Sequence, residues 1–164
     1  MPDLSRAGRL VLALCVVAVD AASKAWAVRA LSGAGTRWLW HPWLGLALYW
    51  NRGAISDLGA GHPGIVTAVG LVGTAALAVL LLAQRRAGPG VALMLGGGGG
   101  NLLSRLVSGA VPDFIRVYPG HGVFNLADVS LQVGVVWLVV DLLLASGHGR
   151  VSAGRARPAP DGRC

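Results

Sequence analysis

The chain is built from four long apolar stretches that are separated by polar or aromatic connections. The apolar stretches cover residues 10–31, 65–83, 90–107 and 129–145. A helix that crosses a bilayer needs about 20 mostly apolar residues, and each stretch approaches or reaches that length. The pattern therefore predicts an all-α membrane protein with four transmembrane helices.

The connection over residues 32–63 has a different character. It is rich in tryptophan, and residues 44–50 nearly alternate between larger and smaller side chains. An alternation of this kind is typical of a strand, and Trp and Tyr rings are stable at the membrane–water interface. The backbone of an edge strand cannot lie unpaired in hydrocarbon. We therefore expect short strands that pack on the helices or stay at headgroup level, as a small β-cradle on the outer face.

Arginine residues indicate the orientation in the membrane. One side of the predicted spans carries Arg6, Arg9, Arg85, Arg86, Arg150, Arg155, Arg157 and Arg163. The other side carries Arg37, Arg52 and Arg116, in segments that also contain Trp and Tyr. Because basic residues are retained preferentially in the cytoplasm, we expect both termini there. Residues 147–164 are rich in Gly, Ala, Pro and Arg, which predicts a disordered cytoplasmic tail after one membrane domain at residues 1–146.

Composition agrees with a membrane protein and limits its partners. Of the 164 residues, 54% are hydrophobic and 13% are charged, which is too apolar for an ordinary soluble domain. The net charge of +7 lies mostly in tails and short loops, where membrane topology and anionic headgroups explain it better than nucleic acid does. The cysteines and histidines have no disulfide or metal-ligand spacing. We therefore expect neither nucleic acid nor a metal ion as a partner.

Two pairs of polar residues lie inside the predicted spans. Asp20 and Lys24 are four residues apart, on one helical face and at about mid-bilayer depth. They form either a self-neutralising pair or a polar scaffold under a functional site, and the cost of a charged pair that faces lipid favours the scaffold. Asn101 and Arg105 have the same spacing. A structural hydrogen bond and a snorkelling side chain explain them as well as a substrate role does.

Two aspartates flank the last outer connection. Asp113 alone reads as an exposed loop acid, and Asp128 alone reads as the N-cap of the fourth helix. The third span runs outward and the fourth runs inward, so their connected ends should be neighbours. Side chains expected to converge there are Asn51, Asn101, Arg105, Asp113, Asn125 and Asp128. Two carboxyl groups in a partly dry pocket share one proton, which provides a base for water and an acid for a carbonyl.

Five motifs occur in a fixed order along these segments. They cover residues 20–24, 51–54, 100–105, 111–114 and 124–128. In these motifs the chain resembles lipoprotein signal peptidase, also called signal peptidase II, over about residues 8–146. The resemblance implies four transmembrane helices, with a β-cradle on the outer side that matches residues 32–63.

The resemblance also implies roles for individual residues. Asp113 and Asp128 correspond to the catalytic aspartates of the family. The residues that line or support the site would be Asn51, Gly53, Asn101, Arg105, Asn125, Asp20 and Lys24.

The implied reaction is hydrolysis of prolipoprotein signal peptides just before a diacylglyceryl-modified cysteine. The partners would be these prolipoproteins and membrane lipid. The resemblance further implies a monomer in the bacterial inner membrane, with its active site at the outer face and no cofactor.

The chain departs from the family pattern at a few positions. Ser104 stands where the family has an aspartate, and Ile55 and Ser56 replace an Ala-Phe pair. These changes leave open a catalytically altered relative that binds or processes a restricted set of lipopeptides. A small membrane transporter subunit is a further alternative, although the paired half-repeats typical of transporters are absent from the sequence.

Overall fold

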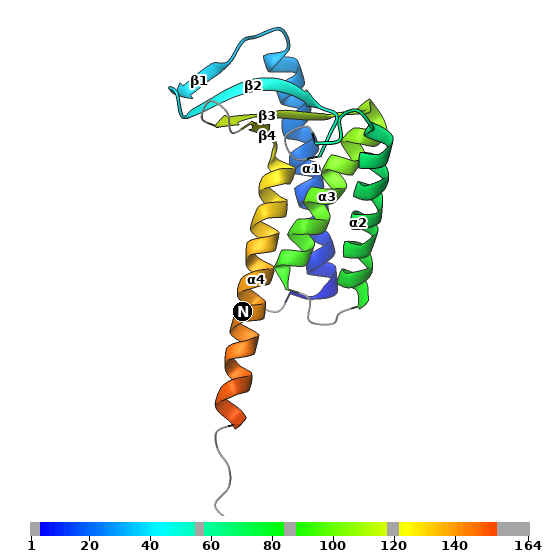
Figure 1. Ribbon diagram of the computed structural model, residues 1–164, viewed down its shortest axis with the longest axis vertical. Coiled ribbons are helices and arrows are strands. Elements are labelled where there is room, and N and C mark those ends of the chain that lie inside the picture. The colour runs from blue at the N-terminus through cyan, green and yellow to red at the C-terminus, as the bar shows by residue number, and fades with distance from the viewer. Residues whose placement is uncertain (1–3, 55–57, 84–87, 118–121, 154–164) are drawn as a thin grey trace, which may run out of the picture.

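Four helices and four short strands make up the part of the chain that the computed structural model describes, which is residues 4–54, 58–83, 88–117 and 122–153. In chain order they are α1 (Arg6–Leu31), β1 (Arg37–Trp40), β2 (Leu44–Asn51), α2 (Pro63–Ala83), α3 (Pro89–Ser108), β3 (Val111–Val117), β4 (Val123–Phe124) and α4 (Leu126–Ala153). The helices run side by side as a bundle, and the sheet lies across one end of it (Figure 1). Each predicted apolar stretch therefore forms a helix.

Hydropathy separates α3 from the other helices. By length and composition, α1, α2 and residues Leu126–Leu144 of α4 can cross a membrane, with mean hydropathies of 1.8, 2.5 and 1.9. Helix α3 is 20 residues long but does not reach the same hydropathy, because it contains a run of glycines and several polar residues. The prediction of apolar, membrane-spanning helices is thus confirmed for three of the four.

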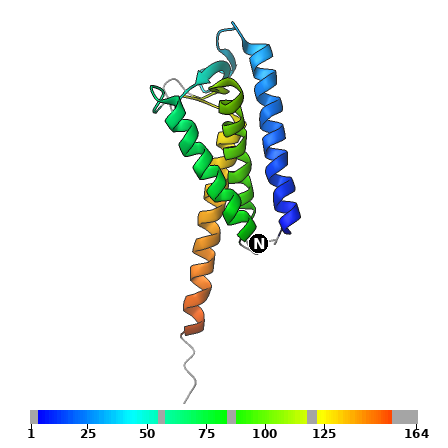
Figure 2. The same cartoon turned by 90° about the vertical axis from the view of Figure 1, so that its right-hand side faces the viewer.

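Helix α3 lies in the middle of the bundle. It contacts α1, α2 and α4, and Figure 2 shows it between α1 and α2. Three consecutive glycines make this position available, since each lies against a different neighbour. A Cβ atom on Gly96 would be 2.8 Å from the Ala13 oxygen of α1, and one on Gly97 would be 2.5 Å from the Ala127 oxygen of α4. One on Gly98 would be 3.0 Å from the Thr74 hydroxyl of α2.

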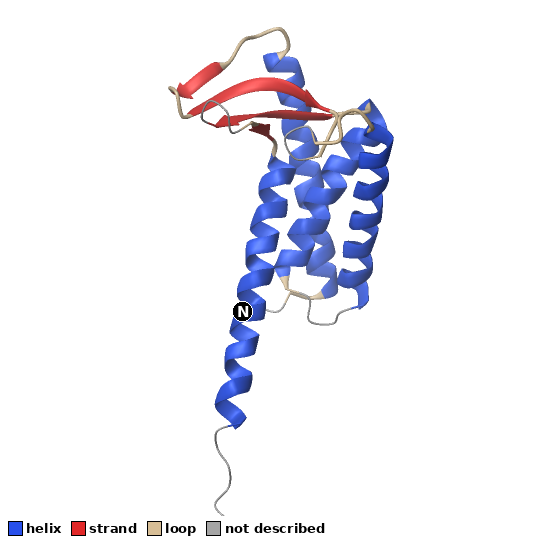
Figure 3. Ribbon diagram, viewed as in Figure 1, coloured by secondary structure: helices blue, strands red, loops and turns tan. Residues whose placement is uncertain are grey.

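The sheet is antiparallel, in the order β1-β2-β3-β4 (Figure 3). Its first two strands come from the tryptophan-rich segment, as predicted. The sequence interpretation missed the other two, which belong to the connection between α3 and α4. The cradle therefore extends beyond residues 32–63, and Asp113 lies in a strand, not in a loop. Phe114 of β3 packs with Ala27 and Leu31 of α1 and so fixes the sheet to the bundle.

Helix α4 is longer than the sequence predicted. It continues to Ala153, so residues 147–153 are helical where a disordered tail was expected. The rest of that predicted tail, residues 154–164, lies outside the described residues.

Candidate active site

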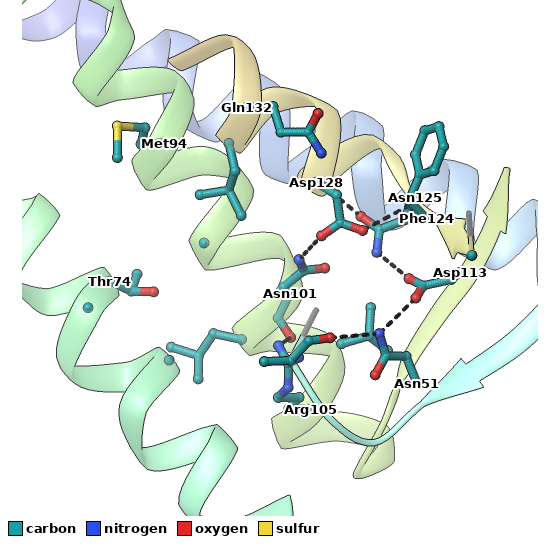
Figure 4. A pocket seen from close by; sticks show the side chains of 18 of the residues that line it. Asn51, Thr74, Met94, Asn101, Arg105, Asp113, Phe124, Asn125, Asp128 and Gln132 are labelled. Atoms are coloured by element: carbon teal, nitrogen blue, oxygen red, sulfur yellow. Dashed lines mark hydrogen bonds between the residues drawn. The ribbon is translucent and has the colours of Figure 1, made fainter. Parts of the chain in front are cut away.

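Asp113 is held by two asparagine amides (Figure 4). Its partner across the β2–β3 pair is Tyr49, and its side chain is 1% exposed. Asn51 donates from Nδ2 to Asp113 Oδ2 at 3.0 Å, and Asn125 donates from Nδ2 to Asp113 Oδ1 at 2.5 Å. Both carboxylate oxygens therefore have a donor, as a buried carboxyl group requires.

Asp128 lies in the first turn of α4 and shares a capping box with Asn125. The Asn125 backbone N–H donates to Asp128 Oδ2, and the Asp128 N–H donates to Asn125 Oδ1, each at 3.1 Å. Asn125 is thus the cap, and Asp128 is the third residue of the helix, so the alternative interpretation of Asp128 as the N-cap is wrong. Asn125 also binds Asp113, and this one side chain therefore links the two aspartates.

A polar chain connects Asp128 to the interior of the bundle. Asn101 of α3 donates from Nδ2 to Asp128 Oδ1 at 2.8 Å. Lys24 of α1 donates from Nζ to Asn101 Oδ1 at 2.8 Å and to Asp20 Oδ2 at 2.7 Å. Asp20 Oδ1 accepts the N–H of Ala127 in α4 at 2.9 Å. The pair predicted as a polar scaffold therefore lies directly beneath the site and is buried.

Arg105 closes the other side of the site. Its NH2 group donates to the Gly53 carbonyl oxygen at 2.7 Å, and its NH1 group donates to the Asn101 carbonyl oxygen at 3.5 Å. Gly53 in turn donates its N–H to Asn51 Oδ1 at 2.9 Å. Ser104, the departure inside this motif, donates its hydroxyl to the Gly100 carbonyl at 3.0 Å, so Arg105 is positioned without help from it. Ile55 and Ser56 lie outside the described residues.

The structure brings together every residue that the sequence placed at the site. Asn51, Asn101, Arg105, Asp113, Asn125 and Asp128 line one cavity of about 660 Å³. Gly53 and Lys24 hydrogen-bond to these residues from behind, and Asp20 binds Lys24. Among the described residues, no group of three or more His, Cys, Asp and Glu side chains could hold a metal ion.

Sequence reasoning missed the wall of the cavity that α2 provides. This wall consists of Gly70, Gly73, Thr74 and Leu77, and it faces Met94 and Leu131 of the neighbouring helices. The four α2 residues recur at helical spacing, i, i+3, i+4 and i+7. That spacing was the available signal, but small residues at these positions are equally typical of close helix packing.

Burial controls the protonation of Asp113. It raises the pKa of this carboxyl group from 3.8 to about 6, and repulsion by Asp128 acts in the same direction. The amide N–H groups of Asn51 and Asn125 lower the pKa but do not offset the burial. Asp113 thus binds a proton more tightly than an ordinary aspartate, as expected for one member of an acid–base pair.

Comparison with known proteins agrees with the motifs. The model of the family described as signal peptidase (SPase) II matches residues 12–144. A lipoprotein signal peptidase of Methylorubrum extorquens is 33% identical over 147 residues, covering 82% of this chain and 84% of that protein. One of Methylobacterium radiotolerans is 32% identical over 166 residues, covering 94% and 96%.

Solved structures share the fold. A bacterial membrane enzyme solved at 2.3 Å superposes with a TM-score of 0.76 at 20% identity, covering 98% of this chain and 99% of that one. A second, solved at 1.9 Å, gives a TM-score of 0.72 at 22% identity and covers 82% and 92%. The match of the family over most of the chain, with relatives above 30% identity at nearly full length, confirms the resemblance seen in the motifs. The chain belongs to the signal peptidase II family of aspartic proteases.

Proposed function

We propose that Asp113 and Asp128 are the catalytic pair with which this membrane protease removes signal peptides from prolipoproteins. The main support for this proposal is that Asn125 hydrogen-bonds to carboxyl groups from both β3 and α4 at the wall of one cavity. The cleaved bond is the peptide bond just before the diacylglyceryl-modified cysteine.

The two carboxyl groups take different roles in the reaction. Asp113, with a pKa of about 6, carries the shared proton and donates a hydrogen bond to the scissile carbonyl oxygen. Asp128 accepts N–H groups from Asn101 and Asn125, which orient its carboxyl group toward the cavity. It removes a proton from water as the water oxygen attacks the carbonyl carbon. That proton then passes to the leaving nitrogen as the C–N bond breaks, giving a free carboxyl and a free amino group.

The membrane arrangement follows from the helices. Helices α1, α2 and α4 cross the membrane, and α3 crosses with them as the fourth span, because its position inside the bundle gives it protein neighbours in place of lipid. The site then lies at the outer face of the bacterial inner membrane, with both termini in the cytoplasm.

The substrate enters sideways from the bilayer. The cavity is lined by apolar side chains of α2, α3 and α4 as well as by the polar pair. An apolar signal peptide can therefore remain in a lipid-like environment while its carboxyl end reaches the aspartates. The chain acts on one substrate at a time as a monomer, since both aspartates come from the same chain.

The test is cleavage of a diacylglyceryl prolipoprotein by the purified protein. Asp113→Asn and Asp128→Asn should each reduce turnover by at least about 1,000-fold, and the double variant should be no worse, because the two carboxyl groups act as a unit. Asp141→Asn is the matched control, since it removes an α4 aspartate that does not line the cavity. Near-normal turnover by either single variant would contradict the aspartic mechanism.

The pH dependence gives a second measure of the pair. The pH–rate profile should be bell-shaped, with apparent constants that belong to the pair. The pKa of Asp113 in the folded protein is above the ordinary value of 3.8, so protonation of this carboxyl group stabilises the fold. This contribution to the free energy of unfolding is present below about pH 4 and is lost as the pH rises through about 6. The melting temperature of the wild-type protein relative to Asp113→Asn should therefore fall over this window. An unchanged difference would show that burial does not perturb Asp113.

A further inference from the structure

The three asparagines at the site are oriented in different ways. Asn51 is fixed by backbone groups, since its Oδ1 accepts from Gly53 N–H and its Nδ2 donates to the Ala54 oxygen. Asn125 is fixed by the backbone N–H of Asp128. Asn101 is fixed by a charged side chain, the ammonium group of Lys24.

We infer that Lys24 is a positioning residue, which sets the orientation of the Asn101 amide so that its N–H group, and not its oxygen, faces the Asp128 carboxyl group. The inference rests on the proposed function and goes beyond it, because Lys24 neither lines the cavity nor touches either aspartate of the pair in any described hydrogen bond.

The chemistry of the ammonium group makes the orientation unambiguous. Lys24 is 4% exposed and carries only donors, so the group that faces it at 2.8 Å must be the Asn101 oxygen. The amide nitrogen of Asn101 then points to Asp128 Oδ1, also at 2.8 Å. The reversed amide would place N–H groups against the ammonium and a carbonyl oxygen against the carboxylate. Both contacts would be repulsive, so the reversed amide is disfavoured.

Asp20 is the acidic partner of Lys24 within the bundle. Its Oδ2 accepts from Lys24 Nζ at 2.7 Å, and its Oδ1 accepts the N–H of Ala127 at 2.9 Å. A buried ion pair is tolerated only when its remaining polar atoms are also satisfied. Gly100 leaves space for the Asp20 carboxylate, because a Cβ atom on residue 100 would be 2.5 Å from Asp20 Oδ2.

Charged groups of several elements interact electrostatically with Asp128. They are Lys24 and Asp20 of α1, Arg105 of α3 and Asp113 of β3, while α2 contains no titratable side chain. Arg105 is held by the Gly53 carbonyl on the other side of the site, so its contribution does not depend on Lys24. Removal of Lys24 therefore removes one cation and frees one amide, and both changes make protonation of the aspartate pair easier.

The experiment compares pH–rate profiles of the full-length protein on a diacylglyceryl prolipopeptide. Lys24→Met should lower kcat by about 10- to 100-fold with little change in KM, and should move the acid limb of the profile upward by about one pH unit. Asn101→Ala leaves the Lys24–Asp20 pair in place but breaks the link, so it should move the acid limb in the same direction. The double variant should add little to either single change, because Lys24 acts through Asn101.

Arg9→Met is the matched control for the loss of a buried cation. Arg9 lies in the same helix and is 1% exposed, but it lies near the opposite end of the helix. The Arg9→Met substitution should lower stability without moving the acid limb of the pH–rate profile. If the Lys24→Met protein does not fold, Lys24→Gln is measured in its place, since Asn101→Ala by itself tests only the contact between Asn101 and Asp128.

An acid limb that does not move in folded Lys24→Met or Asn101→Ala overturns the inference, as do additive effects in the double variant. In both cases the wild-type protein still cleaves the lipidated substrate and the proposed function stands. A wild-type protein that does not cleave this substrate would instead contradict the proposed function itself.

Discussion

Helices α2 and α3 are of nearly equal length, at 21 and 20 residues, but they differ in how much of each helix is buried by the rest of the protein. Leu81 is the one buried residue among those of α2, and the rest of the helix is apolar apart from Thr67 and Thr74. Helix α3 buries eight residues, four of them glycines. A helix that faces lipid must be apolar, whereas one surrounded by protein can carry polar side chains wherever they find partners. The site residues Asn101 and Arg105 accordingly lie on α3.

The glycines of α3 allow the neighbouring helices to pack closely around it. In lipid no hydrophobic effect drives helices together, so close contact depends on small side chains and interhelical hydrogen bonds. Gly97 lies against the first turn of α4, and Gly100 lies against Asp20 of α1. These contacts place Asn101 between Lys24 and Asp128. Helix packing and the geometry of the candidate site are thus set by the same stretch of α3.

Among the substitutions that test the difference between α2 and α3, Gly97→Ala should have the largest effect on cleavage and on stability. The added Cβ atom would be 2.5 Å from the Ala127 oxygen and 2.9 Å from Leu131 Cγ, so α4 must move at the turn that carries Asp128. We expect cleavage to fall by at least about 100-fold and the melting temperature to drop. Thermal unfolding and turnover in detergent would measure both effects.

The control for Gly97→Ala is Gly64→Ala in α2. A Cβ atom at Gly64 meets nothing within 4 Å, so this change should be neutral or stabilise the helix by up to about 1 kcal/mol. Equal effects of the two substitutions would show that α3 is not more tightly packed than α2.

Gly73→Leu tests the cavity wall that α2 provides. A Cβ atom at Gly73 has open space within 4 Å, and the residue lines the cavity. A leucine should therefore leave stability unchanged but occupy substrate space, and we expect kcat/KM to fall by about tenfold, mainly through KM. Gly64→Leu, which adds the same side chain to α2 away from the cavity, should leave kcat/KM unchanged. If both variants behave alike, the substrate does not use this wall.

The sequence predicted the four helices and the convergence of the site because both follow from simple rules. Hydropathy marks a helix, and the alternating direction of successive spans brings the Asp113 and Asp128 segments to one end. The order of the motifs then identified the family, and with it the site residues. Each of these signals is local or depends only on connectivity.

Other features could not be predicted because they depend on partners distant in the chain. Strand β3 is stabilised by pairing with residues 44–51, and β4 is stabilised by pairing with β3, so a window around Asp113 resembles a loop. The cap of α4 is Asn125 and not Asp128, since both residue types cap helices and the choice depends on Asp113 and Asn101 as competing partners. The cavity wall of α2 recurs at helical spacing, but small residues at such spacing are equally typical of close helix packing, so the sequence does not separate a cavity wall from a packed interface.

Ser104→Asp should have the smallest effect, and it tests how much α3 tolerates. The family carries an aspartate at this position, but here the Ser104 hydroxyl bonds to the Gly100 carbonyl, and Arg105 reaches the Gly53 oxygen at 2.7 Å unaided. A new carboxylate beside Arg105 therefore adds one partly exposed ion pair, worth up to about 1 kcal/mol. We expect unchanged folding and a rise in turnover of about two- to threefold, because a better-held Arg105 holds Gly53 and Asn51 more firmly.

Ser104→Ala separates the two parts of that change, since it removes the hydroxyl bond without adding charge. It should leave turnover within about twofold of the wild-type value, because back-bonding of a helical serine contributes little stability. A folded Ser104→Asp protein that no longer cleaves would mean that the new carboxylate withdraws Arg105 from Gly53. In that case the strength of the Arg105–Gly53 contact, and not the presence of an acid at position 104, determines activity in this chain.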